Sequence, residues 1–247
     1  MIGFLKHLLP PPPDEQVLGE TIYLRPPRIK DWRVWAELRG ISRDFLAPWE
    51  PTWPSDALSR AAYRRRLRHY VESWRKQTGY TFFIFRRSDD ALLGGIGLTN
   101  IRRGINQSGT LGYWIGKPYA RQGIMTEALR CVLSFAFGNL DLHRVEAACL
   151  PANAASRGLL EKCGFRQEGY ATEYLKINGV WSDHALFAKL REDAVSAARK
   201  PGAVKDKDME DARGGVERAA NWHPKRRRLS AGSGGAGRQP GIGSEEA

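Results

Sequence analysis

Residues 112–129 read GYWIGKPYARQGIMTEAL, an order of residue types in which a strand leads into a short basic loop and then into a helix. Backbone N–H groups in the first turn of a helix have no intrahelical partners, and the helix dipole adds positive partial charge there. The loop before Ile124 is therefore predicted to bind an anion through main-chain amides, strengthened by Lys117 and Arg121. The alternative is an ordinary strand-to-helix connection. A P-loop is excluded because the stretch has no GxxxxGK[ST] pattern.

On either side of this stretch the hydrophobic pattern mixes strands and helices, which indicates an α+β fold. Helices are expected after Asp31 and Asn153, each acting as an N-cap, after Gly123, and from Ser55 onward. The dipeptide Asn178-Gly179 is a strong hairpin signal between two final strands. Further strands are expected at 21–25, 81–87, 92–101, 110–115 and 144–150, the middle three as an antiparallel meander.

Composition divides the chain into three parts. Residues 1–18 are expected to be an irregular lead-in, and residues 19–191 the folded domain. Residues 192–247 contain a Ser/Gly-rich run and lack apolar periodicity, so they are expected to form a disordered basic tail. The sequence has no run of about 18 apolar residues and no secretory signal pattern, and its three cysteines show no CxxC spacing. These features predict a cytoplasmic protein with no metal site and no membrane association.

The chain carries 39 basic and 27 acidic residues, a formal net charge of +12. Residues 1–191 hold 28 of the basic and 18 of the acidic residues, so the excess belongs mainly to the expected domain. A basic domain suits an anionic ligand, which leaves nucleic acid, an acidic protein surface and a phosphorylated cofactor as candidates.

A second informative segment spans residues 142–170 and contains LHRVEA, PANAAS and LLEKCGFRQEGY. With the glycine loop, this segment resembles the GNAT superfamily of N-acetyltransferases. The motifs PWEP at 48–51 and NGVWSDH at 178–184 are similar to its RimJ/RimL branch, the ribosomal-protein-alanine N-acetyltransferases. The resemblance covers residues 19–191. It implies a mostly antiparallel sheet flanked by helices and splayed between its fourth and fifth strands, with the thioester of acetyl-CoA in the gap.

The resemblance also implies residues for the cosubstrate acetyl-CoA. The loop is expected to hold the pyrophosphate by main-chain N–H groups, Asn153 to contact the pantetheine arm, and a backbone N–H near Tyr113, Trp114 and Ile115 to stabilise the oxyanion. The family pattern Q/R-x-x-G-x-G/A falls on residues 120–125, where the first position is Ala and the last is Met, which puts individual side-chain contacts in doubt. The expected cofactor-binding residues are Trp114, Ile115, Arg121, Gln122, Gly123, Ile124, Met125, Thr126 and Asn153.

Catalysis needs a neutral amine, a donor for the oxyanion and a group that stabilises the leaving thiolate. Many superfamily members carry a tyrosine for the thiolate where this chain has Leu160, so the resemblance points instead to Ser156, which matches a serine of RimL-type relatives. Two carboxylates, Glu50 and Glu146, are candidate general bases, and the sequence does not choose between them. Glu127, in the first helical turn, is expected to complement the dipole.

These residues predict an acetyl-CoA-dependent N-acetyltransferase that acts on the N-terminal alanine, or a similar amine, of a protein such as a ribosomal protein. One alternative is a small-molecule amine as acceptor. Another is a non-catalytic module associated with RNA or the ribosome, since the basic run at 225–228 in the tail suits weak contact with nucleic acid.

Overall fold

The computed structural model describes residues 15–193, to which the following account refers. None of the helices in this part of the chain is long and apolar enough to cross a membrane. The expected tail, apart from its first two residues, and most of the expected lead-in lie outside the described residues. The strands are β1 (Val17–Leu18), β2 (Ile22–Arg25), β3 (Tyr80–Arg86), β4 (Leu92–Arg102), β5 (Ser108–Ile115), β6 (Arg144–Cys149), β7 (Arg166–Ile177) and β8 (Val180–Leu190). The helices are α1 (Trp32–Ile41), α2 (Arg43–Leu46), α3 (Arg60–Lys76), α4 (Ile124–Ser134) and α5 (Ala154–Lys162), with short 3-10 turns η1 (Ile29–Asp31), η2 (Ala47–Trp49) and η3 (Lys117–Tyr119) and a π-helical turn η4 (Phe135–Asn139).

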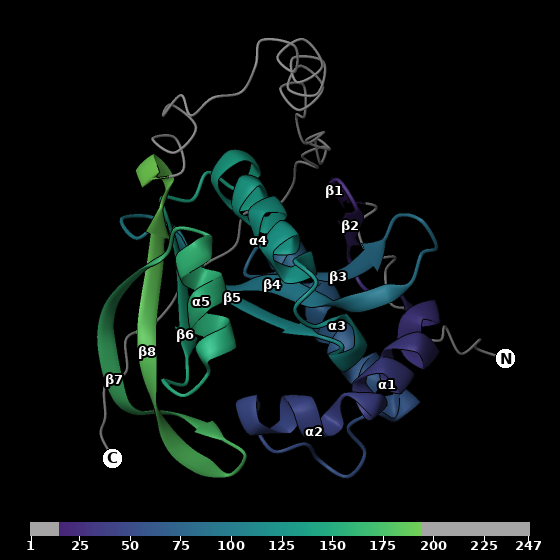
Figure 1. The fold of residues 1–247 in the computed structure, drawn as a ribbon. Helices are drawn as coiled ribbons and strands as arrows, with labels where there is room; N and C mark the ends of the chain where they lie inside the picture. Colours follow the sequence, from purple (N-terminus) through teal and green to yellow (C-terminus); the bar gives the residue numbers. More distant parts are fainter. Residues whose placement is uncertain (1–14, 194–247) are drawn as a thin grey trace, which may run out of the picture. The chain divides into compact units, whose positions relative to one another are not determined.

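The strands of residues 15–193 form one sheet in the order β1-β2-β3-β4-β5-β6-β8-β7 (Figure 1). Neighbouring strands are antiparallel except for β5 and β6, which are parallel. The expected α+β class, the mostly antiparallel sheet and the meander β3-β4-β5 are therefore confirmed.

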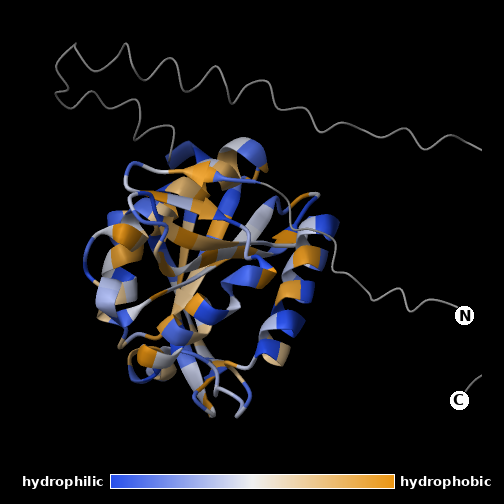
Figure 2. Cartoon of the chain, turned by 90° about the vertical axis from the view of Figure 1, so that its right-hand side faces the viewer, coloured by the Kyte–Doolittle hydropathy of each residue, from blue (hydrophilic) through white to orange (hydrophobic). Residues whose placement is uncertain are grey.

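Helices cover both faces of the sheet. Large side chains of β3 alternate between the two faces, so each face presents an apolar surface on which helices pack. Phe82 and Ile84 belong to a cluster with the buried face of α4, whereas Phe83 and Phe85 pack with α1 and α3. Figure 2 shows hydrophobic residues concentrated in the central strands and hydrophilic residues on the outer helix surfaces. The sheet thus separates two sides, an α4/α5 side and an α1/α3 side.

The strands β5 and β6 pair only over Ser108–Thr110 and Arg144–Glu146. Beyond this register, β5 continues to Ile115 and β6 to Cys149 without a ladder between them in the described structure. Counted from the strand at residues 21–25, these are the fourth and fifth strands, so the predicted splay of the sheet is confirmed.

One helix starts later than predicted, and another starts where predicted but without the expected cap bond. The helix expected from Ser55 begins at Arg60, because residues 54–59 form tight turns and the Ser59 hydroxyl accepts the cap bond from the Ala62 N–H at 3.1 Å. Asp31 does precede α1, but its side chain makes no cap bond. Instead it accepts from the Arg25 guanidinium at 2.7 and 2.8 Å, which joins β2 to the helix start.

Two short elements were not predicted, whereas a predicted helix cap and a predicted hairpin turn are confirmed. Within the expected irregular lead-in, Val17 and Leu18 pair with β2. The helix α2 was not predicted, since four residues are too few to show a helical period. Asn153 caps α5 as predicted, accepting from the Ser156 N–H at 3.0 Å, and Asn178-Gly179 forms the β7–β8 turn with positive φ at both residues.

Candidate active site

The basic loop leaves a row of backbone amides without partners. After η3 the chain passes through Arg121 and Gly123, both at positive φ (60° and 81°), and enters α4. In the described part of the chain, none of the N–H groups from Arg121 to Thr126 donates a hydrogen bond to the protein. The Lys117 N–H, in contrast, donates to the Ser42 hydroxyl at 2.9 Å, which fixes the start of the loop. The loop therefore presents a concentrated set of donors at the positive end of a helix dipole.

Two side chains of this segment, those of Gln122 and Glu127, make hydrogen bonds within the protein. Gln122 Nε2 donates to the Pro118 carbonyl at 2.9 Å and closes the loop on itself. Glu127 accepts from the Thr21 N–H at 2.8 Å, the Thr21 hydroxyl at 2.6 Å and the Ile22 N–H at 3.4 Å. Burial alone would raise the pKa of Glu127, but these hydrogen bonds outweigh it and hold the pKa below its ordinary value. Glu127 thus fastens β2 to the first turn of α4.

The gap between β5 and β6 exposes backbone groups of β5. The Gly116 N–H donates to Leu93 O in β4 at 2.9 Å, and peptide groups alternate along a strand. The N–H groups of Tyr113 and Ile115 consequently point away from β4, toward the gap, whereas the N–H of Trp114 points toward β4. Of the predicted oxyanion donors, the geometry therefore favours Tyr113 and Ile115 over Trp114.

The Trp114 indole lies on the α1/α3 side of the sheet, directly over Gly95. A Cβ added at Gly95 would stand 2.4 Å from Trp114 Nε1, so only glycine leaves room for the ring. This explains part of the glycine-rich run in β4 as close packing. Arg39 lies over the same indole at 4.9 Å from the ring centroid.

At the end of the gap, Tyr113 and Ser156 meet. The Tyr113 hydroxyl lies 2.6 Å from Ser156 Oγ, and Tyr113 is largely buried. Burial raises the pKa of the Tyr113 phenol well above its ordinary value, so the phenol stays protonated. Sequence reasoning had considered only the backbone of Tyr113. The signal available was its place in alternation with Leu111 and Ile115, which turns its side chain to the α4/α5 side.

Glu50 lies at a cavity of about 390 Å³ on the α1/α3 side. We call it the tryptophan cavity, after its lining residues Trp35, Trp53 and Trp114, which stand with Arg39, Glu50 and Gly112. Both Glu50 oxygens are occupied, since they accept from Arg39 at 2.8 and 2.6 Å, and one also accepts from Trp53 Nε1 at 2.8 Å. Arg39 is only 8% exposed, which makes this a largely buried ion pair.

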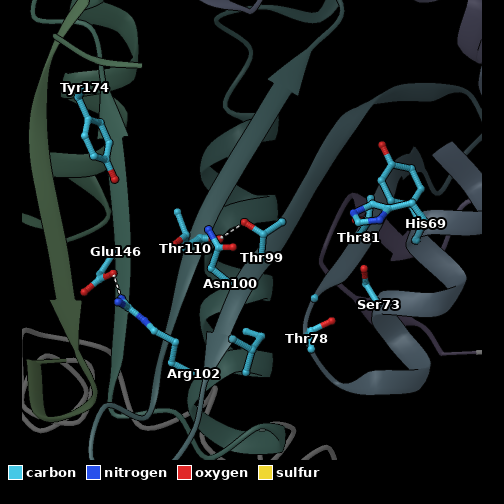
Figure 3. A pocket seen from close by; sticks show the side chains of 13 residues that line it. His69, Ser73, Thr78, Thr81, Thr99, Asn100, Arg102, Thr110, Glu146 and Tyr174 are labelled. Atoms are coloured by element: carbon cyan, nitrogen blue, oxygen red, sulfur yellow. Dashed lines mark hydrogen bonds and ion pairs between the residues drawn. The ribbon is translucent and has the colours of Figure 1, made fainter. Parts of the chain in front are cut away.

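Glu146 lies on β6 opposite Thr110 of β5, at the last residue pair before the strands part. It faces the α1/α3 side and lines a second cavity of about 640 Å³ (Figure 3). Its carboxylate contacts Arg102 at 2.6 Å and Arg144 at 3.0 Å. Glu50 and Glu146 therefore line different cavities, and each is paired with at least one guanidinium.

The fold and this loop match a known class. The sequence model of the acetyltransferase (GNAT) domain matches residues 21–166. The chain belongs to the GNAT family of acetyltransferases and is an N-acetyltransferase, as the motifs at 112–129 and 142–170 predicted.

Particular relatives narrow the comparison. The chain is 41% identical over 175 residues to the probable N-acetyltransferase YjcK of Bacillus subtilis, covering 71% of this chain and 97% of that protein. It is 33% identical over 162 residues to the ribosomal protein uS5-alanine N-acetyltransferase of Escherichia coli, covering 66% and 83%. Among solved structures, the ribosomal-protein-S5-alanine acetyltransferase of Vibrio fischeri superposes with a TM-score of 0.68 at 30% identity, covering 73% and 98%. Mycobacterium smegmatis RimJ in complex with CoA-disulfide gives 0.66 at 30% identity, covering 72% and 90%.

Proposed function

We propose that this protein transfers the acetyl group of acetyl-CoA to the N-terminal alanine amine, or a similar amine, of a protein such as a ribosomal protein. The observation that carries the proposal is the row of unpartnered amides from Arg121 to Thr126 at the start of α4. The relatives that act on ribosomal-protein alanine support the acceptor.

The residues present fit the cosubstrate. A diphosphate needs several donors and positive potential, which the loop amides, Lys117 and Arg121 provide. Because these donors are main-chain groups, Ala120 and Met125 in place of the family's usual residues do not remove them. The unpaired edge of β5 and the Asn153 side chain suit the amide groups of a pantetheine arm. Acetyl-CoA supplies the activated thioester, and the protein supplies position and polarity.

For the leaving group we propose that Ser156 and Tyr113 act together. The amine nitrogen forms a bond to the acetyl carbon, the carbon–sulfur bond breaks, and the sulfur leaves with its electron pair. The Ser156 hydroxyl donates to this thiolate while it accepts from the Tyr113 hydroxyl, which strengthens it as a donor. The N–H groups of Tyr113 and Ile115 stabilise the oxygen on which negative charge develops.

The amine must lose a proton, and we propose Glu146 as the group that receives it, through water. Glu146 stands where β5 and β6 part, on the side from which an acceptor reaches the gap. Glu50 was the other candidate base. Both carboxylates pair with arginine, but the Glu50 partner Arg39 is buried, whereas the Glu146 partner Arg102 has a side chain that is 49% exposed. We therefore assign Glu50, which also accepts from Trp53, the role of shaping the tryptophan cavity.

A peptide-library screen tests the acceptor. The library carries every residue at its first position, and mass spectrometry maps which amine gains an acetyl group. We expect acetylation of the α-amine with a preference for alanine. Transfer to lysine side chains or only to small amines would overturn the acceptor class. Thermal shift with acetyl-CoA tests the cosubstrate independently, since a ligand at 100 times its Kd stabilises by about 2.7 kcal/mol.

A further inference from the structure

The larger of the two cavities has no role in the chemistry above except at Glu146. Its lining is dominated by hydroxyl groups, so we call it the hydroxyl cavity (Figure 3). Its polar lining residues are His69, Tyr70, Ser73, Thr78, Thr81, Thr99, Asn100, Arg102, Thr110, Glu146 and Tyr174. From this arrangement we propose that the hydroxyl cavity binds the backbone of the acceptor polypeptide from about its third residue onward. This inference rests on the proposed function.

The hydroxyl cavity adjoins the tryptophan cavity. Tyr70, Thr81 and Thr99 line both, and both are floored by β4 and β5 on the α1/α3 side. A molecule whose end lies in the tryptophan cavity therefore continues into the hydroxyl cavity without leaving the surface of the sheet.

The spacing along β5 suits a peptide. The amine must lie where β5 leaves β6, next to Gly112, which lines the tryptophan cavity. Thr110, on the same face two residues earlier, lines the hydroxyl cavity. Two strand residues span roughly 7 Å, and an extended acceptor advances about 3.3 Å per residue. The third residue of the acceptor is then the first to reach Thr110.

The chemistry of the lining favours an uncharged backbone as ligand. The two ionised side chains at the cavity, Arg102 and Glu146, pair with each other at 2.6 Å. The other polar groups are mainly hydroxyls and the Asn100 amide, which can both donate and accept hydrogen bonds. Such a lining matches the alternating C=O and N–H groups of a peptide better than it matches a phosphate or a polyamine, each of which needs unpaired charge of the opposite sign.

Acceptors of increasing length test the inference: alanine amide and its dipeptide, tripeptide and tetrapeptide amides. For the unmodified protein we expect kcat/KM to rise by roughly tenfold or more between the dipeptide and the tetrapeptide, since a tenfold change needs only one or two hydrogen bonds. His69→Trp fills the hydroxyl cavity from the exposed face of α3 and should reduce this gain to about twofold at most, with the dipeptide unaffected. Ala61→Trp, on an exposed position of α3 that lines neither cavity, is the matched control and should keep the full gain.

A second variant addresses the hydrogen bonds without changing volume. Thr110→Val removes one hydroxyl from the cavity floor and should lower kcat/KM for the tetrapeptide about threefold while sparing the dipeptide. The inference is overturned if the unmodified protein shows no length dependence, or if His69→Trp lowers all acceptors equally. If no peptide of any length is acetylated, the proposed acceptor class itself fails, and the inference with it.

Discussion

The hydroxyl of Tyr113 lies 2.6 Å from Ser156 Oγ, although the two residues are 43 positions apart and belong to β5 and α5. The cap bond from the Ser156 N–H to Asn153 holds the serine at the first turn of α5, while burial holds the phenol in its protonated form. The pair therefore places two hydrogen-bonded hydroxyl groups at the end of the gap between β5 and β6.

Removing either hydroxyl should slow the reaction and leave binding of acetyl-CoA almost unchanged. We expect kcat to fall about tenfold in Ser156→Ala and in Tyr113→Phe, which corresponds to about 1.4 kcal/mol of transition-state stabilisation. The decrease in kcat of the double variant should be much smaller than the product of the two single decreases, because the hydroxyls act as one unit. Steady-state kinetics and calorimetric titration with CoA measure both quantities. Unchanged turnover in Ser156→Ala would remove the pair from the mechanism.

Gly123→Ala should weaken binding of acetyl-CoA about tenfold and lower the free energy of unfolding by about 1 kcal/mol. An added Cβ meets no atom within 4 Å, so the cost comes from the φ of 81°, which alanine adopts poorly. Gly158→Ala is the matched control, since it also meets no atom within 4 Å but lies inside α5 at an ordinary helical φ. It should leave the affinity unchanged and stabilise the protein slightly. Equal affinity in both variants would contradict the anion site at the loop.

Glu127→Gln should destabilise the protein by about 2 kcal/mol at pH 7, because the charged acceptor of three hydrogen bonds is lost. The pKa of Glu127 in the folded state lies below 4.5, its ordinary value. At a pH between these two pKa values, the unfolded chain binds more protons than the folded protein. The contribution of Glu127 to the free energy of unfolding is therefore complete above pH 4.5 and is lost as the pH falls through the folded pKa. Urea unfolding at pH 7 and at pH 3 measures the free energy of unfolding of variant and parent. The difference between the two proteins should be smaller at pH 3 than at pH 7. A pH-independent difference would show that packing, not charge, is responsible.

Substitutions of the two carboxylates should have different effects on stability and on turnover. Glu50→Ala leaves the largely buried Arg39 without its partner and should cost about 3 kcal/mol of unfolding free energy. Glu146→Gln should cost less than about 1 kcal/mol, since the Arg102 side chain is 49% exposed. If Glu146 receives the proton, Glu146→Gln should also lower kcat about 100-fold in steady-state kinetics. An unchanged kcat would exclude Glu146 as the base.

Local signals in the sequence were sufficient for most of the fold. Strand alternation, the Asn153 cap and the Asn178-Gly179 turn each depend on neighbouring residues, and each appears in the structure where it was expected. The predicted start of α3 was wrong, because Ser55 and Ser59 are both plausible caps and the choice depends on turns made by residues 54–59.

The site was less accessible to sequence reasoning because its geometry is made by distant segments. Ser156 was predicted from resemblance, but the side chain of its partner Tyr113, which lies on β5 and not on α5, was not. Likewise, no pattern in the sequence predicts that Glu50 pairs with Arg39, or Glu146 with Arg102 and Arg144. Arginines are abundant in this chain, and their contacts are set by tertiary packing.

The short ladder between β5 and β6 has a further consequence. Past Thr110, one half of the sheet is joined to the other by side chains and covering helices rather than by a continuous ladder. The amides of Tyr113 and Ile115 form an interior sheet edge, and a ligand that bonds to them takes the place of a missing strand. Such a ligand should slow deuterium uptake at these two amides far more than at their buried neighbours, so occupancy of the gap can be followed in the absence of any acceptor or turnover.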